Sequence, residues 1–199
     1  MADAGGLMSR RVGEVVAAAS TSFVAQCYQL YGAPPLGSFV RTDSPWVYGV
    51  VCRVSTEPLD SSRPVLARGE SASSEDEVFR DNPQLARLLT TRFDALIAGH
   101  QAGEECRHFL PPLPPPVHSF VYACSPAETV QFTDRLDFMS LLLSSGVPVV
   151  DEVVGACLRA AATAQPDGAE FLVRAGKALA SELAGDVPRL NFILRRVAP

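Results

Sequence analysis

The fold is decided by residues 11–54, which read RVGEVVAAASTSFVAQCYQLYGAPPLGSFVRTDSPWVYGVVCRV. This stretch contains several β-rich runs, each ended by glycine or proline, with short connections between them. Parallel strands need connections of a dozen or more residues, so short connections predict antiparallel pairing in a small barrel or sandwich. The stretch contains no nucleophile with a partner base, no metal-ligand spacing and no phosphate-binding loop. It therefore predicts an architecture and no chemistry.

Four strands are expected within this stretch, over residues 12–20, 22–30, 38–42 and 46–54. In the second strand, successive side chains are expected to point to opposite faces. Phe23, Ala25 and Cys27 then lie on one face, and Val24, Gln26 and Tyr28 lie on the other. The segment 32–37 contains two prolines, which cannot donate to a sheet ladder, so it is expected to form a rigid turn.

Residues 55–124 are expected to complete the barrel. Most of segment 55–77 is polar and turn-forming, with a short edge strand at Pro64–Ala67. Asn82 and Pro83 form a helix-start signal, which predicts an inserted helix near 82–90. The remaining strands are expected at 93–98, 104–109 and 118–124. The proline tract 111–116 is interpreted as a stiff spacer in preference to a polyproline II ligand.

The pattern changes at Ser125. Ser125-Pro126-Ala127-Glu128 is a capping box with proline at the first helical position, which predicts a helix that ends at Gly146. Further helices are expected at 149–162, from Asp167 to near Gly185, and at 188–197. The sequence thus predicts an α+β protein: a flexible tail over 1–10, a small antiparallel β-barrel over 11–124, and a C-terminal α-helical bundle over 125–199.

Composition limits the functional classes. The chain has 199 residues, a net charge of −5 and a single lysine, Lys177, which argues against a protein that mainly coats phosphate backbones. No apolar run reaches the roughly 20 residues that span a bilayer, and the N-terminus lacks the order of a signal peptide. The five cysteines are widely spaced, which favours reduced, mostly buried thiols and a cytoplasmic location.

Polar clusters do not predict a reaction centre. Cys106 and His108 would share a face of a strand, and with Cys124 or His118 they are weighed as zinc ligands, but the sequence contains no closely spaced ligand pair typical of structural zinc. Scattered structural residues are the favoured interpretation. The acidic run 75–77 is interpreted as a solvated face. We therefore predict no catalytic, cofactor or metal site, and no small-molecule substrate.

The aromatic residues near the Pro-Pro turn point to protein contacts instead. Aromatic anchors dominate interface energetics, so these residues and the turn form a candidate protein-interaction surface. Packing of the barrel rim under the turn explains the same residues equally well. The candidate surface comprises Tyr28, Tyr31, Pro34, Pro35, Leu36 and Trp46.

The order of these motifs resembles the HAS-barrel, the domain shared by the HerA DNA translocase and the catalytic-ring subunits of ATP synthase. The resemblance covers roughly residues 11–124, in the form of a stand-alone barrel. It is carried by YGAPPLGSFVR at 31–41, VYGVV at 47–51, NPQL at 82–85, FDALIAG at 93–99 and LPPPVH at 113–118.

The resemblance implies assembly. Such barrels join subunits into the ring crown of ATP synthase, and in HerA they are expected to dock a partner nuclease and help organise the hexamer. This chain departs from those proteins because it lacks the P-loop core. Its nearest string, Arg174-Ala175-Gly176-Lys177, lacks the required glycine spacing and hydroxyl, and lies in a helical pattern.

The sequence therefore predicts a non-catalytic assembly or docking module that self-associates or binds a ring-forming ATPase or its partner protein. The alternative is a nucleic-acid-associated accessory factor linked to a HerA-type DNA-processing system. The acidic balance of the chain and the lack of interleaved arginine and aromatic residues in the sequence argue against this alternative. An enzyme with an unrecognised site is the third hypothesis.

Overall fold

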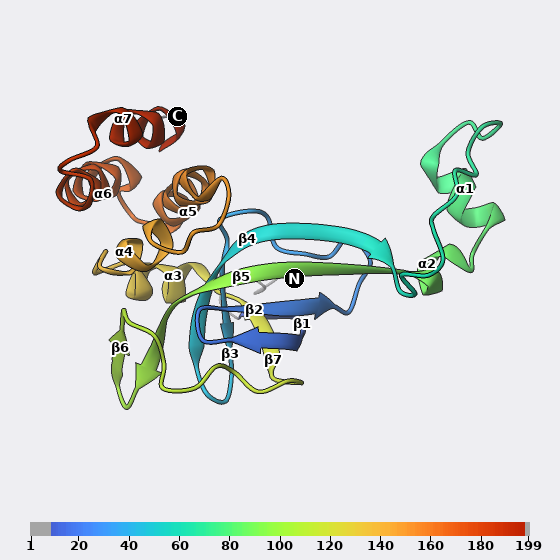
Figure 1. Cartoon of the computed structure of the whole chain (residues 1–199), viewed down its shortest axis with the longest axis horizontal. Coiled ribbons are helices and arrows are strands. Elements are labelled where there is room, and N and C mark those ends of the chain that lie inside the picture. Colours follow the sequence, from blue (N-terminus) through green and yellow to red (C-terminus); the bar gives the residue numbers. More distant parts are fainter. Residues whose placement is uncertain (1–8, 198–199) are drawn as a thin grey trace, which may run out of the picture.

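Six antiparallel strands close into a barrel in the computed structural model, which describes residues 9–197 (Figure 1). The strand order is β2-β1-β7-β3-β4-β5, and pairing between β2 and β5 closes the barrel. A seventh strand, β6, pairs only with the end of β5. The strands are β1 (Arg10–Ala19), β2 (Ser22–Cys27), β3 (Phe39–Thr42), β4 (Val47–Pro58), β5 (Leu89–Ala102), β6 (Glu105–Arg107) and β7 (Phe120–Ala123).

The antiparallel barrel predicted from the short connections is confirmed. In β2, Phe23, Ala25 and Cys27 are buried while their neighbours are half-buried, so the predicted alternation holds. Phe93, Ala95 and Ile97 of β5 join them inside the barrel. Of the tail predicted over 1–10, residues 1–8 lie outside the described residues, and β1 begins at Arg10.

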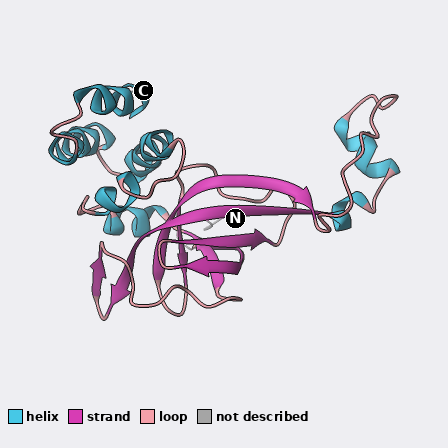
Figure 2. Cartoon of the chain, viewed as in Figure 1, coloured by secondary structure: helices cyan, strands magenta, loops and turns pink. Residues whose placement is uncertain are grey.

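Helices follow the barrel, as predicted, and cover one of its outer faces (Figure 2). Outward residues of β3 and β4 pack with the helices in one hydrophobic cluster, in which the Phe132 ring lies 4.6 Å from Tyr48 and 5.6 Å from Phe39. The helices are α3 (Pro126–Phe132), α4 (Phe138–Leu143), α5 (Val150–Ala164), α6 (Gly168–Glu182) and α7 (Val187–Val197).

The capping box at Ser125 is present as predicted: the Ser125 hydroxyl accepts from the Glu128 amide, and the Glu128 carboxylate accepts from the Ser125 amide. The predicted single helix up to Gly146 is instead two helices, because α3 ends at Phe132 and α4 starts at Phe138. The Asp167 side chain caps α6 by accepting a 2.9 Å hydrogen bond from the Glu170 amide.

The Pro-Pro turn lies directly on α5. Gly37 has a φ of +81°, and a Cβ added there would lie 2.5 Å from backbone atoms of Ala156 and Cys157. Only glycine tolerates both this backbone conformation and this approach. The predicted rigid turn therefore positions the helices against the barrel.

The largest difference from expectation lies between β4 and β5. Both strands are longer than predicted, and their paired ribbon continues past the barrel to Pro58 and Leu89. The connection, residues 59–88, is called the arm from here on. Figure 1 shows it projecting from the end of the barrel opposite the C-terminal helices. No residue of the arm is buried.

The arm contains α1 (Glu75–Asp81) and α2 (Leu85–Leu88) in place of the single helix expected near 82–90. Ser74 caps α1, and the acidic first turn 75–77 suits the positive end of the helix dipole. Asn82, expected as an N-cap, is the C-cap of α1 and donates its side-chain amide to the Val78 carbonyl. The edge strand expected at Pro64–Ala67 does not form.

Candidate protein-binding surface

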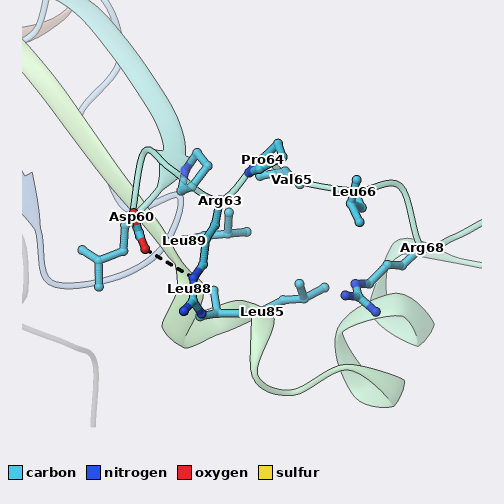
Figure 3. Close-up of a pocket in the computed structure, with 11 residues that line it drawn as sticks. Asp60, Arg63, Pro64, Val65, Leu66, Arg68, Leu85, Leu88 and Leu89 are labelled. Atoms are coloured by element: carbon cyan, nitrogen blue, oxygen red, sulfur yellow. Dashed lines mark ion pairs between the residues drawn. The ribbon is translucent and has the colours of Figure 1, made fainter.

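An apolar cleft lies where the arm leaves the barrel (Figure 3). Leu85 and Leu88 of α2 face Pro64, Val65 and Leu66 of the opposite segment, and the end of the β4–β5 ribbon closes the base. The cavity volume is about 170 Å³. Small-molecule sites commonly enclose roughly 300–1,000 Å³, so this cleft suits one or two anchoring side chains better than a metabolite.

Charged residues line the mouth of the cleft. The Arg63 guanidinium lies 3.3 Å from the Asp60 carboxylate, so these two charges are paired. Arg68 also lines the cleft, and among residues 9–197 no carboxylate lies within ion-pair distance of it. The cleft thus combines an aliphatic lining with one unpaired positive charge, a combination that favours an apolar segment carrying a carboxylate.

The arm leaves these aliphatic side chains open to solvent. Neither α1 nor α2 contains a buried residue. Leu66 has 66% of its surface exposed, and Leu59, Val65 and Leu88 are also exposed. Exposed apolar side chains scattered singly are ordinary, but a group of them around one cleft is typical of an interaction site.

Tyr31 is the one member of the predicted interaction surface that lies beside the arm. Its ring makes an edge-to-face contact with Phe79 of α1, at 6.3 Å between centroids, and remains 63% exposed. Its backbone amide donates to the Thr91 hydroxyl at 2.8 Å. Tyr31 therefore extends the apolar surface of the arm onto the barrel.

Tyr28 and Trp46 lie in other surroundings. The Tyr28 hydroxyl donates to the Glu14 carboxylate at 2.9 Å, and the Arg11 guanidinium lies over the Tyr28 ring. Trp46 packs against Arg41, whose guanidinium lies 4.2 Å from the centre of the indole. Both aromatic rings are exposed.

Pro34, Pro35 and Leu36 divide between burial and exposure. Pro34 is buried, whereas Pro35 and Leu36 are exposed. The two prolines line a second cleft, of about 300 Å³, between the barrel and helices α3 and α5. Four of the six predicted residues, Tyr28, Tyr31, Leu36 and Trp46, have exposed aromatic or aliphatic side chains and stay candidates for contact.

Sequence reasoning missed the arm cleft. Polar residues and a proline separate Leu59 from the adjacent pair Val65 and Leu66, so no apolar periodicity links them. Leu85 and Leu88 come near them only because α2 folds back on the preceding segment. Leucine and valine within a polar stretch were the only available signal.

An ion pair between Arg41 and Glu128 links β3 to α3. Arg41 is buried, and its Nε donates to the Glu128 carboxylate at 2.7 Å. Burial acts to raise the pKa of Glu128, but hydrogen bonds from Ser9, the Ser125 backbone and Arg41 outweigh it. The net pKa of Glu128 lies below its ordinary value of 4.5, so the carboxylate is ionised at neutral pH.

The residues weighed as zinc ligands do not form a group of three or more. Within residues 9–197 there is no group of three or more His, Cys, Asp or Glu side chains that could hold a metal ion. His118 pairs with Glu14 at 3.0 Å, while His108 contacts the Phe132 ring. Burial lowers the pKa of His108 and raises the pKa of Cys106 to about 11.

All five cysteines are free, and Cys27, Cys52 and Cys157 are buried. Burial raises the pKa of the Cys27 and Cys52 thiols to about 11, so these thiols are protonated at neutral pH. Over the described range, no helix has the length and apolar character needed to cross a membrane.

Comparison of the sequence with family models and curated proteins identifies no family for this chain. The relation of the barrel to the HAS-barrel group accordingly stays a prediction that rests on the motifs at 31–41 and 47–51. No family model matches the chain, and no curated protein matches it either.

Proposed function

We propose that this protein is a non-catalytic docking or assembly module. Its barrel is of HAS-barrel type, and the projecting arm makes the contacts with other proteins. The partner is another copy of the chain, a ring-forming ATPase or the partner protein of such an ATPase. The location we propose is the cytoplasm, in keeping with five free thiols.

The observation that carries this proposal is the apolar cleft of the arm. A 30-residue connection with no buried residue contributes nothing to the barrel core, yet it holds aliphatic side chains around a cavity. Short helices are marginal in water unless an apolar face packs against something. Contact with a partner supplies such a surface for α1 and α2.

A photo-crosslinking experiment tests the proposal. A benzophenone amino acid replaces Leu66 in the full chain, expressed in its native cells, and the adducts are identified by mass spectrometry. The matched control places the same group at Val173 of α6, whose exposure of 58% is close to the 66% of Leu66. We expect a discrete protein adduct at Leu66 and none at Val173. Absence of adducts at both positions contradicts the proposal.

A second candidate function, nucleic-acid association, is favoured by one observation. Arginine and aromatic side chains alternate across the outside of β1, β7 and β3: Arg11 lies over Tyr28 and Phe120, and Arg41 over Trp46 and Tyr122. Single strands bind such surfaces by base stacking and phosphate contacts.

Fluorescence anisotropy with a labelled single-stranded oligonucleotide separates this candidate from docking. Binding that weakens with salt and falls at least tenfold in Arg11→Ala supports it. If neither the wild-type chain nor Arg11→Ala raises the anisotropy of the oligonucleotide, nucleic-acid association is excluded and the docking proposal is unaffected.

A further inference from the structure

The arm carries two faces of opposite character. One is the cleft, lined by aliphatic side chains together with Asp60, Arg63 and Arg68, which give it a net charge of +1. The other is α1, whose first turn consists of Glu75, Asp76 and Glu77 and carries a charge of −3. The same thirty residues thus present an apolar, positively charged recess and an acidic helix.

These charges are not satisfied within one copy. Glu77 lies 3.3 Å from Arg80, but Glu75 and Asp76 are exposed and have no ion pair with any residue from 9 to 197. Arg68 likewise has none. Figure 3 shows the Arg68 side chain over the open end of the cleft, above the α1 ribbon, so α1 does not cover the cleft of its own chain.

Val78 and Phe79 give α1 an apolar side as well. Both are only half-buried, and Phe79 contacts the exposed ring of Tyr31. A second α1 that approached the cleft would bring aliphatic and aromatic surface together with carboxylates, the combination that the cleft lining favours.

We propose that the occupant of the cleft is α1 of a second copy of this chain, so that two arms pair around a two-fold axis and each acidic helix covers the other's cleft. A two-fold interface uses the same patch on both subunits, which must therefore be self-complementary. The arm meets this condition because it carries both faces. The arm also projects past the end of the barrel strands, which leaves it accessible to a second copy (Figure 1).

This inference rests on the proposed docking function and names its partner. The arm is small compared with interfaces of about 1,200–2,000 Å² that hold stable complexes. We therefore expect a concentration-dependent dimer in exchange with monomer, not an obligate one. Salt should weaken it, because exposed charges are screened over about 8 Å at physiological ionic strength.

Charge reversal tests the pairing by sedimentation equilibrium of the full chain. Arg63→Glu/Arg68→Glu makes the cleft acidic, and Glu75→Arg/Asp76→Arg makes the first turn of α1 basic. Each double variant alone juxtaposes like charges in both contacts of a two-fold dimer. We expect the dimer dissociation constant of each to rise at least tenfold.

An equimolar mixture of the two double variants should restore association, because both contacts of the heterodimer then join opposite charges. The quadruple variant should self-associate for the same reason. Circular dichroism melts confirm that all variants are folded, which is expected because the four positions are exposed. Lys177→Glu/Arg195→Glu changes the net charge by the same amount as Arg63→Glu/Arg68→Glu, but at exposed helical positions outside the arm, and should leave the dimer unchanged.

The outcomes separate this inference from the docking function on which it rests. A wild-type chain that stays monomeric at every concentration overturns arm pairing, as does a dimer that the arm variants leave intact. If the Leu66 crosslink then joins a different protein, docking stands and the second copy is not the occupant. If the Leu66 position also yields no adduct, the docking function itself fails.

Discussion

At the scale of single residues, Gly37 fixes the distance between the Pro-Pro turn and α5. Its positive φ is available to glycine at little cost, and its missing Cβ leaves room for the backbone of Ala156 and Cys157. Neither requirement can be relieved by rotation of a flexible side chain, because the neighbouring atoms belong to a helix backbone.

Gly37→Ala should therefore destabilise the protein by two separate effects. The left-handed conformation costs an L-residue about 1–2 kcal/mol, and overpacking against the helix adds about 1–3 kcal/mol. Chemical denaturation measures the sum. Gly103→Ala is the matched control, since Gly103 also has a positive φ but no atom within 4 Å of an added Cβ. Equal losses in both variants would show that the contact with α5 contributes nothing.

The ion pair between Glu128 and Arg41 makes the link between α3 and the barrel depend on pH. Because its pKa is lowered in the folded state, the carboxylate contributes stability above its unfolded pKa near 4.5, and this contribution is lost as pH falls through the folded pKa. Glu128→Gln should cost about 1.5–3 kcal/mol at neutral pH, the range for hydrogen bonds to charged groups.

Urea denaturation of both chains between pH 7 and pH 3 measures this effect. The difference in free energy of unfolding between the two chains should be largest at neutral pH. It should shrink below pH 4.5, where the wild-type carboxylate becomes protonated and therefore neutral, like glutamine. A difference that stays constant across this range would mean that the charge of Glu128 is irrelevant to stability.

Contacts between residues close in sequence could be predicted, whereas contacts between residues far apart in sequence could not. Ser125 and Glu128 are three residues apart, so the spacing alone indicates their capping box. The partner of Arg41 lies 87 residues away in sequence, and no pattern in one sequence identifies that pairing. The same limit applies to the candidate site, where Tyr31 was predicted as a contact residue but Phe79, its neighbour from the arm, was not.

At the scale of elements, the arm is where sequence and structure differ most. Asn82-Pro83 is a strong helix-start signal, but the acidic run before it forms a helix first and uses Asn82 as its end. The barrel strands were predictable because alternation and turn residues are local. The length of the β4–β5 ribbon was not, since Ser55–Glu57 are polar and extend the pairing outside any core.

The arm should be removable without loss of the barrel. An Asn-Gly turn in place of residues 60–87 joins Leu59 to Leu88, whose backbone groups already form a 2.8 Å hydrogen bond. We expect the free energy of unfolding to change by less than about 1 kcal/mol, because no buried residue is lost and a long loop is shortened. Thermal and urea denaturation measure this change.

The shortened chain also serves as a test of the arm's role. It should be monomeric at concentrations where the full chain associates. A shortened chain that no longer unfolds cooperatively would instead make the arm part of the fold, and its exposed aliphatic residues would need another explanation.

At the scale of the whole molecule, the barrel and the helices share a core. The inside of the barrel holds one apolar cluster, while a second joins the outer face of β3, β4 and β5 to all the C-terminal helices. The compositional change at Ser125 coincides with the change from strands to helices. It does not coincide with a gap in the packing, because Phe132 of α3 contacts both Phe39 and Tyr48 of the barrel.

Phe132→Ala should therefore weaken the barrel and the helices together. Phe132 is buried against aromatic rings from both regions, and loss of a buried phenylalanine costs about 3–5 kcal/mol. Trp46 is the only tryptophan and lies on the barrel, so its fluorescence reports barrel unfolding, while circular dichroism at helical wavelengths reports the helices.

In the wild-type chain the two probes should give coincident transitions, which is the signature of a single cooperative unit. In Phe132→Ala both transitions should move to lower denaturant by the same amount, whereas Val173→Ala, at an exposed position of α6, should move neither. If the helical signal alone shifts while Trp46 fluorescence keeps its midpoint, the helices unfold independently. The barrel would then be the sole stable base for the arm, and the cluster around Phe132 would be a contact between two separate folding units.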